Sequence, residues 1–276
     1  MESVHATERA MQITTLGTSH GSPTCSRFSS STLIETADRA YLVDAGSPVH
    51  ALLVRAGKPV DLLSAVFVTH MHEDHAGGLP GLCKHFIKER RDTRSGLRVF
   101  LPDQKACEPL DAWCRALCFD WPNEAVLLEV TSEGEVYADN HINVRAERTR
   151  HMESENGAPS FAYAIRAEGL RVVFTGDLAA DFTDFPALAR DEPCDLCVCE
   201  ATHYDFRAAV LVLKDAPIRR LVLNHVHDPW HGQDGERQLL EIMRDLSYPV
   251  YIAHDGDVWD IGQGDPWQAN NEKGNT

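Results

Sequence analysis

Short apolar runs alternate with amphipathic segments along most of the chain, a pattern that predicts both strands and helices. The apolar runs are typical of strands, and they lie at residues 12–16, 31–35, 41–43, 62–68, 98–101, 126–128, 141–145, 161–165, 171–174, 196–198, 220–223 and 250–252. Helical periodicity falls between some of them, at residues 49–56, 76–90, 104–118, 205–214 and 235–246. Early strands are expected to pair as hairpins and later ones to be joined through helices. The pattern therefore predicts two sheets covered by helices in a layered α/β structure.

Length and composition are those of an ordinary soluble protein. The chain has 276 residues, of which 43% are hydrophobic, and its mean hydropathy is −0.29. No apolar run approaches the roughly 20 residues that a membrane helix needs, and the first residues lack the layout of a signal peptide. We expect one domain over residues 1–276, located in the cytoplasm and without a membrane partner.

The charge balance bears on the partners. With 42 acidic and 26 basic residues, the formal net charge is −16. An acidic surface repels a phosphate polymer, so extended nucleic acid is disfavoured as a partner and a small molecule is favoured.

Eight cysteines raise the alternative of a zinc or disulfide site. Cys194 and Cys197 form a CxxC, but no second CxxC or CxxH pair accompanies it, whereas structural zinc usually takes four protein ligands. The alternation through Cys199 fits a buried strand. Cys107, Cys114 and Cys118 share a predicted helix, where free cysteine behaves as a small hydrophobe.

A dense cluster of metal-ligand residues follows the apolar run 62–68. The stretch VTHMHEDHAGG places His70, His72, Asp74 and His75 within six residues, directly after a predicted buried strand and before a helix. Strand packing needs no imidazoles at that point. Neutral imidazole and carboxylate suit zinc or a similar metal, so the motif predicts a metal site.

This HxHxDH motif resembles that of the metallo-β-lactamase superfamily, whose four-layer αβ/βα sandwich commonly carries two metal ions between its sheets. The resemblance extends over residues 13–261 and implies further ligands. They are His151 before the predicted hairpin at 160–174, Asp177 in Phe174-Thr175-Gly176-Asp177, and His225 after the strand 221–224. His70, His72 and His151 would hold one divalent ion and Asp74, His75 and His225 the other, with Asp177 between them. Zinc is the first expectation, with manganese or iron as alternatives.

The opening of the chain resembles one branch of that superfamily, the ribonuclease Z-like phosphodiesterases. Residues 16–24 (LGTSHGSPT), 29–32 (SSST) and 42–46 (LVDAG) carry the likeness, and Glu200-Ala201-Thr202-His203 resembles the segment that supplies the catalytic histidine of that branch. The HST motif of ribonuclease Z proper is absent. The branch often dimerises, which implies a homodimer here.

The resemblance implies a mechanism in which a metal-bridging hydroxide attacks a phosphodiester. His203 would protonate the leaving alkoxide, Glu200 would orient His203, and Asp74 would hold its metal and take the proton of the nucleophile. The expected substrate is small, possibly a cyclic nucleotide. Bacterial ribonuclease Z reaches transfer RNA with a flexible basic arm inserted between the third histidine and the bridging aspartate, an interval that here runs only from His151 to Asp177.

Several alternatives stay open at this point. A lactone or thioester hydrolase uses the same metal centre, ribonuclease Z-type RNA processing belongs to the same branch, and a non-catalytic binding protein could keep the fold. His141 competes with His151 as the third histidine, although it opens a predicted strand instead of ending one. The sequence assigns no role to His20, His227 and His231, and it identifies neither the natural substrate nor the native metal.

Overall fold

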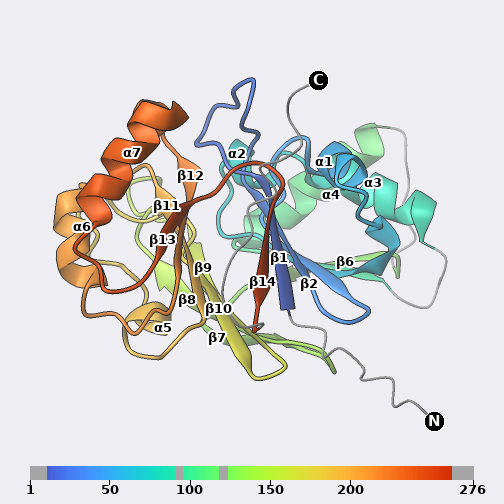
Figure 1. The fold of residues 1–276 in the computed structure, drawn as a ribbon. Helices are drawn as coiled ribbons and strands as arrows, with labels where there is room; N and C mark the ends of the chain where they lie inside the picture. Colours follow the sequence, from blue (N-terminus) through green and yellow to red (C-terminus); the bar gives the residue numbers. More distant parts are fainter. Residues whose placement is uncertain (1–10, 91–95, 118–123, 263–276) are drawn as a thin grey trace, which may run out of the picture.

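The computed structural model describes residues 11–90, 96–117 and 124–262, and it contains two seven-stranded sheets that face each other (Figure 1). The first sheet has the order β14-β1-β2-β3-β4-β5-β6. Its strands are β1 (Met11–Gly17), β2 (Ser31–Glu35), β3 (Ala40–Val43), β4 (Leu63–Phe67), β5 (Leu97–Leu101), β6 (Val126–Val130) and β14 (Asp257–Ile261).

The second sheet has the order β13-β12-β11-β10-β9-β8-β7. Its strands are β7 (Gly134–Ala138), β8 (Asn143–Thr149), β9 (Ser160–Ala167), β10 (Leu170–Phe174), β11 (Leu196–Ala201), β12 (Leu221–Val226) and β13 (Val250–Ile252). In each sheet, antiparallel hairpins give way to parallel strands, at β3–β4 in the first and at β10–β11 in the second. Early hairpins and later crossover connections are what the pattern predicted.

Helices cover the outer face of each sheet (Figure 1). The first sheet is covered by α1 (Val49–Arg55), α3 (Leu79–Glu89) and α4 (Cys107–Ala116), and the second by α5 (Ala187–Arg190), α6 (Phe206–Leu213) and α7 (Gly232–Met243). The short α2 (Glu73–Ala76) and the 3-10 turns η1 (Val60–Leu62), η2 (Gln104–Ala106) and η3 (Asp228–Trp230) complete the elements. None of the described helices has the length and apolar character that a membrane crossing requires.

The molecule has four structural layers, namely the two sheets and the helices on the outer face of each. Three apolar cores hold these layers together. Alternate residues of a strand point to opposite faces of its sheet, so Phe67 lies in the core between the sheets while Val66 lies under the helices of the first sheet. In β11, Val198 faces the central core, and Cys197 and Cys199 face the helices of the second sheet. The αβ/βα sandwich is thereby confirmed. That residues 1–276 form one domain stays a prediction.

The cysteines behave as small buried hydrophobes. Cys194, Cys197 and Cys199 are buried, and all cysteines in the described ranges are free. Cys107 and Cys114 lie on α4, as predicted, while Cys118 falls outside the described residues.

The predicted helix at 76–90 begins three residues later, as α3 at Leu79, and Ala76 ends a separate turn, α2. Gly77 and Gly78 separate α2 from α3, and Pro80 lies in the first turn of α3. A side chain on Gly78 would come within 2.7 Å of the carbonyl oxygen of Ala45. The close approach of this segment to the loop after β3 therefore requires glycine. The break leaves α2 as a single turn at the end of the sandwich, and α2 carries Asp74 and His75.

Candidate metal centre

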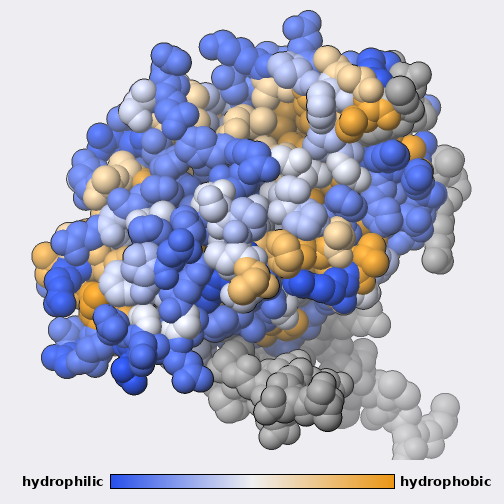
Figure 2. Space-filling model, turned by 90° about the horizontal axis from the view of Figure 1, so that it is seen from above, coloured by the Kyte–Doolittle hydropathy of each residue, from blue (hydrophilic) through white to orange (hydrophobic). Residues whose placement is uncertain are grey.

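The strand ends of both sheets meet at the end of the sandwich that Figure 2 shows, where hydrophilic residues surround small apolar patches. His70 and His72 follow β4, and His72 is the N-cap of α2. The amide of His75 donates a hydrogen bond to the carbonyl of His72, 3.1 Å away, which closes the turn between them. The HxHxDH segment is therefore a strand end followed by one helical turn, as its sequence predicted.

Four of the predicted ligands form a first group. One potential ligand atom each from His70, His72, His151 and Asp177 lies within 4.8 Å of the others. Nε2 of His70 lies 2.9 Å from Nδ1 of His72, and Nε2 of His151 lies 3.3 Å from the same Nδ1. Residues from two sheets thus converge, because His151 follows β8 and Asp177 follows β10.

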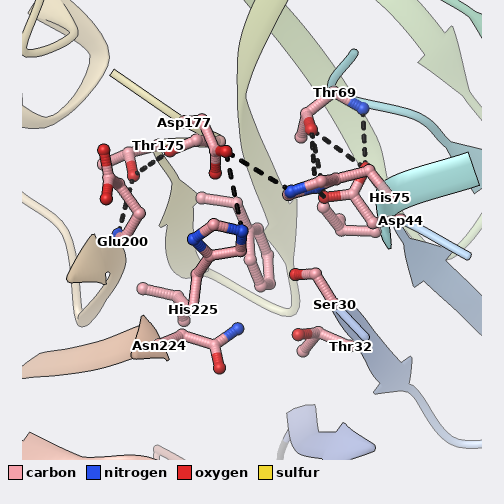
Figure 3. A pocket seen from close by; sticks show the side chains of 14 residues that line it. Ser30, Thr32, Asp44, Thr69, His75, Thr175, Asp177, Glu200, Asn224 and His225 are labelled. Carbon is pink, nitrogen blue, oxygen red and sulfur yellow. Dashed lines mark hydrogen bonds and ion pairs between the residues drawn. The ribbon is translucent and has the colours of Figure 1, made fainter. Parts of the chain in front are cut away.

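Asp74, His75 and His225 form a second group, with ligand atoms also within 4.8 Å of one another. Oδ2 of Asp74 lies 3.0 Å from Nε2 of His225 and 3.3 Å from Nε2 of His75. Figure 3 shows Asp177 between His75 and His225, and its Oδ2 lies 3.4 Å and 3.6 Å from their Nε2 atoms. The same oxygen is 3.7 Å from Nε2 of His70, so Asp177 lies between the two groups.

The chemistry of these donors fits divalent metal ions. Nε2 of His75 and Oδ1 of Asp177 are buried and have no hydrogen-bond partner. Burial lowers the pKa of His75, but Asp177 and Asp44 outweigh it and raise that pKa well above its usual value. Burial lowers the pKa of His70, which favours its neutral, metal-binding form. Buried carboxylates beside imidazole nitrogens favour a cation between them.

Asp44, whose role the sequence analysis missed, holds the second group in place. Its Oδ2 accepts a hydrogen bond from Nδ1 of His75 at 2.8 Å, and its Oδ1 accepts one from the backbone amide of Thr69 at 2.8 Å. A carboxylate on the outer nitrogen fixes the tautomer and the orientation of a ligating histidine. Asp44 lies directly after β3 with φ of +61°, and its place in the LVDAG segment is the signal that could have identified it.

Glu200 and His203 meet beside Asp177. Oε1 of Glu200 lies 3.1 Å from Nδ1 of His203, and Oε2 accepts hydrogen bonds from the backbone amides of Thr202 and His203. Nδ1 of His203 is 3.8 Å from Oδ2 of Asp177. Burial lowers the pKa of His203, but the hydrogen bond that it donates to Glu200 and the negative charge of that carboxylate outweigh burial and raise the pKa to about 9. The contacts with Glu200 and Asp177 favour the protonated form of His203, in which Nε2 carries a proton that it can donate.

The histidines that the sequence analysis left open lie in two places. His141 lies away from both groups, where its Nδ1 is 3.3 Å from the carboxylate of Asp38. His20 and His231 form a further group with Asp228. The structure thus brings together all seven residues that the resemblance implied as ligands, with His151, and not His141, beside His70 and His72.

Comparison with known proteins places the chain in a family. The model of the family described as Anti-Pycsar protein Apyc1 matches residues 11–245. The chain belongs to this family. A ribonuclease Z from Brevibacillus brevis is 25% identical to it over 84% of this chain and 90% of that protein. A ribonuclease Z from Synechococcus sp. strain WH7803 is 30% identical, over 56% of this chain and 47% of that protein, so that match spans about half of the relative.

Solved structures agree on the fold. The metallo-β-lactamase fold protein YhfI from Bacillus subtilis has a TM-score of 0.72 and 22% identity, over 91% of this chain and 99% of that one. This Apyc1-family chain is therefore a metallo-β-lactamase fold protein of the ribonuclease Z-like phosphodiesterase branch, as its motifs predicted. With the two ligand groups, this makes it a metal-dependent hydrolase.

Proposed function

We propose that this protein hydrolyses a small phosphodiester, with a cyclic nucleotide as the first candidate, using two divalent metal ions. The observation that carries the proposal is the pairing of the two ligand groups, with Asp177 between them and His203 beside Asp177. The proposed ligands are His70, His72 and His151 for one ion and Asp74, His75 and His225 for the other. Zinc suits these donors best.

When bound, two such ions would acidify a water molecule and offset the negative charge that develops on the phosphoryl oxygens. The protein's own residues supply the rest. Asp74 lies against both His75 and His225, where it can accept the proton that the attacking water loses. Asp44 keeps His75 in the tautomer that presents Nε2 to the site.

His203 completes the reaction by donating a proton. The bond from water oxygen to phosphorus forms while the bond from phosphorus to the ester oxygen breaks, and the departing oxygen takes the proton from Nε2 of His203. An alkoxide is a poor leaving group until it is protonated, so this transfer lowers the barrier. Glu200 positions the ring through Nδ1 and stabilises its charged form.

The test compares hydrolysis of a phosphodiester with that of a lactone. We expect purified protein containing zinc, manganese or iron to hydrolyse bis-p-nitrophenyl phosphate, and a chelator to abolish the activity. Asp177→Ala should lose metal and activity together, because one carboxylate serves both groups. Turnover of an acyl-homoserine lactone with no turnover of the diester would instead identify a lactone hydrolase.

A second candidate is RNA cleavage, which the similarity to ribonuclease Z favours. It uses the same metal centre and the same proton donor, so the two candidates differ only in how a substrate reaches the site. Access to the site depends on the charge and the topology of the whole molecule.

A further inference from the structure

A third group of metal-ligand side chains lies outside the seven proposed ligands. It consists of His20 in the loop between β1 and β2, Asp228 in η3, and His231 at the N-cap of α7. One potential ligand atom from each lies within 4.8 Å of the others. The proposed hydrolysis uses none of these residues.

The separations of these atoms resemble those around a tetrahedral metal. Oδ1 of Asp228 lies 3.8 Å from Nδ1 of His20 and 3.5 Å from Nδ1 of His231. Zinc bonds to nitrogen and oxygen of about 2.0–2.1 Å place neighbouring ligand atoms about 3.4 Å apart. Shifts of a few tenths of an ångström would bring each of these two pairs to that separation. The first distance is too long for a hydrogen bond and the second is at the limit, so hydrogen bonds between these side chains do not account for the arrangement. The backbone amide of His231 donates to the carbonyl of Asp228 at 3.0 Å, which places these two residues in one turn.

Both histidines present an unshared Nδ1 to the group. Nε2 of His231 donates a hydrogen bond to the carbonyl of Val226 at 2.7 Å, which in the neutral ring leaves Nδ1 with its lone pair on the side of Asp228. A backbone carbonyl on the outer nitrogen is the usual support of a ligating histidine. Nδ1 of His20 is buried and has no hydrogen-bond partner.

The backbone already holds the two contributing segments together. The amide of Val226 donates to the carbonyl of Thr18 at 2.9 Å, and Ser19 pairs with Val226 in an isolated bridge. The ring of His20 packs edge-on against that of His227, with centroids 5.1 Å apart. Two ligands from distant parts of the sequence are thereby fixed before any ion arrives, which reduces the entropy cost of binding. Asp228 is 63% exposed, so the fourth position of an ion here is open to water.

We propose that His20, Asp228 and His231 bind a third divalent metal ion of the zinc type. The ion ties the β1–β2 loop to the segment between β12 and α7. That segment begins two residues after His225, so the ion fixes one wall beside the proposed hydrolytic centre. The inference does not depend on the proposed function, since it concerns metal content alone.

The experiment counts zinc per chain in the full-length protein. Wild type, His20→Ala/His231→Ala and Asp228→Asn are dialysed against the same zinc buffer and analysed by elemental mass spectrometry. We expect each variant to hold about one ion fewer than wild type. Asp228→Asn alters an exposed side chain, so it also tests the group if the double variant fails to fold. The matched control is His141→Ala, which breaks a histidine–aspartate pair without a third ligand and should keep the wild-type zinc content.

An Asp177→Ala background separates this proposal from the hydrolytic centre. We expect that variant to retain about one zinc ion, which His231→Ala in the same chain then removes. Equal zinc content in wild type and both cluster variants would overturn the inference, as would an equal loss in His141→Ala. Loss of all zinc from Asp177→Ala would overturn it as well, while leaving the proposed function intact.

Discussion

At the scale of single residues, the sharpest prediction concerns His203. Nδ1 of His203 contacts Glu200 and lies 3.8 Å from Asp177, and its ring lies beside those of His151 and His225. Because His203 is not among the proposed metal ligands, His203→Ala should keep its metal content. Its turnover of an alkyl phosphodiester should fall by about 10²- to 10⁴-fold, the usual contribution of a positioned acid. The measurement is kcat, with metal content determined on the same samples.

The leaving group provides the control for that prediction. p-Nitrophenolate departs without a proton, so the defect of His203→Ala should shrink on bis-p-nitrophenyl phosphate. Glu200→Gln should lie between wild type and His203→Ala, since it keeps a hydrogen-bonding group but removes the charge. An equal loss on activated and unactivated diesters would assign His203 some other task.

The sequence pattern indicated the proposed ligands, but not the residue that holds one of them in place. The sequence predicted a metal site because four potential ligands lie within six residues and strand packing does not require them there. They are His70, His72, Asp74 and His75. His151, Asp177 and His225 are scattered, and only the family resemblance indicated them before the structure placed them together. Asp44 could not be assigned, because its contact with His75 depends on β3 and β4 being neighbours, a property of the sheet and not of the local sequence.

At the scale of elements, the loop after β3 determines where α2 lies. A side chain at Gly46 would come within 2.0 Å of the backbone oxygen of Asp74 and 2.7 Å of Cβ of Ser29. Gly46→Ala should therefore displace α2, lower the free energy of unfolding by roughly 1–3 kcal/mol and weaken metal binding. Calorimetry and zinc titration measure the two effects. Gly21→Ala is the matched control, because nothing lies within 4 Å of the added atom; equal losses in both variants would contradict the prediction.

Asp139 connects the two sheets and makes stability depend on pH. It accepts hydrogen bonds from the hydroxyls of Tyr41 in β3 and Tyr137 in β7, at 2.7 Å and 2.8 Å, and from the amides of His141 and Ile142. Burial raises the pKa of Asp139, but these hydrogen bonds outweigh it and lower that pKa below the usual value. The charged form therefore stabilises the fold above about pH 4, and its contribution is lost as the pH falls through the folded-state pKa.

Asp139→Asn should remove that contribution. At pH 7 we expect a loss of about 1–2 kcal/mol, the scale of hydrogen bonds to a charged acceptor, and we expect the difference from wild type to shrink below about pH 4. Urea unfolding at several pH values measures it. Asp38→Asn, at an exposed aspartate, should show little change. A difference that grows toward acid pH would contradict the assignment.

An element could be predicted where its signal lies in its own short stretch of sequence. Strands with continuous apolar runs, such as β4 and β10, were placed within a residue or two. β7 and β14 were missed because each is short and half-exposed, and β14 is held by pairing with β1 across nearly the whole chain. The predicted strand at 141–145 begins only at Asn143, because Asp139 holds the amides before it in a turn.

At the scale of the whole molecule, charge and topology bear on substrate size. The net charge of −16 opposes the approach of a long polyanion, because RNA binding draws on clusters of lysine and arginine. Between His151 and Asp177, all of which the structure describes, the chain forms a turn and the hairpin of β9 and β10. That interval holds no inserted arm of the kind expected for bacterial ribonuclease Z. A small diester avoids both obstacles, since metal ions and His203 can neutralise a single phosphate.

We therefore expect a small diester to be the better substrate. The comparison is kcat/KM for 2′,3′- and 3′,5′-cyclic nucleotides against a precursor transfer RNA with a 3′ trailer, measured on one preparation of known metal content. We expect cyclic nucleotides to be hydrolysed more efficiently. His203→Ala should impair both reactions, which separates the chemistry of the centre from access to it. Efficient trailer removal alongside negligible turnover of every small diester would assign the chain to transfer-RNA processing instead.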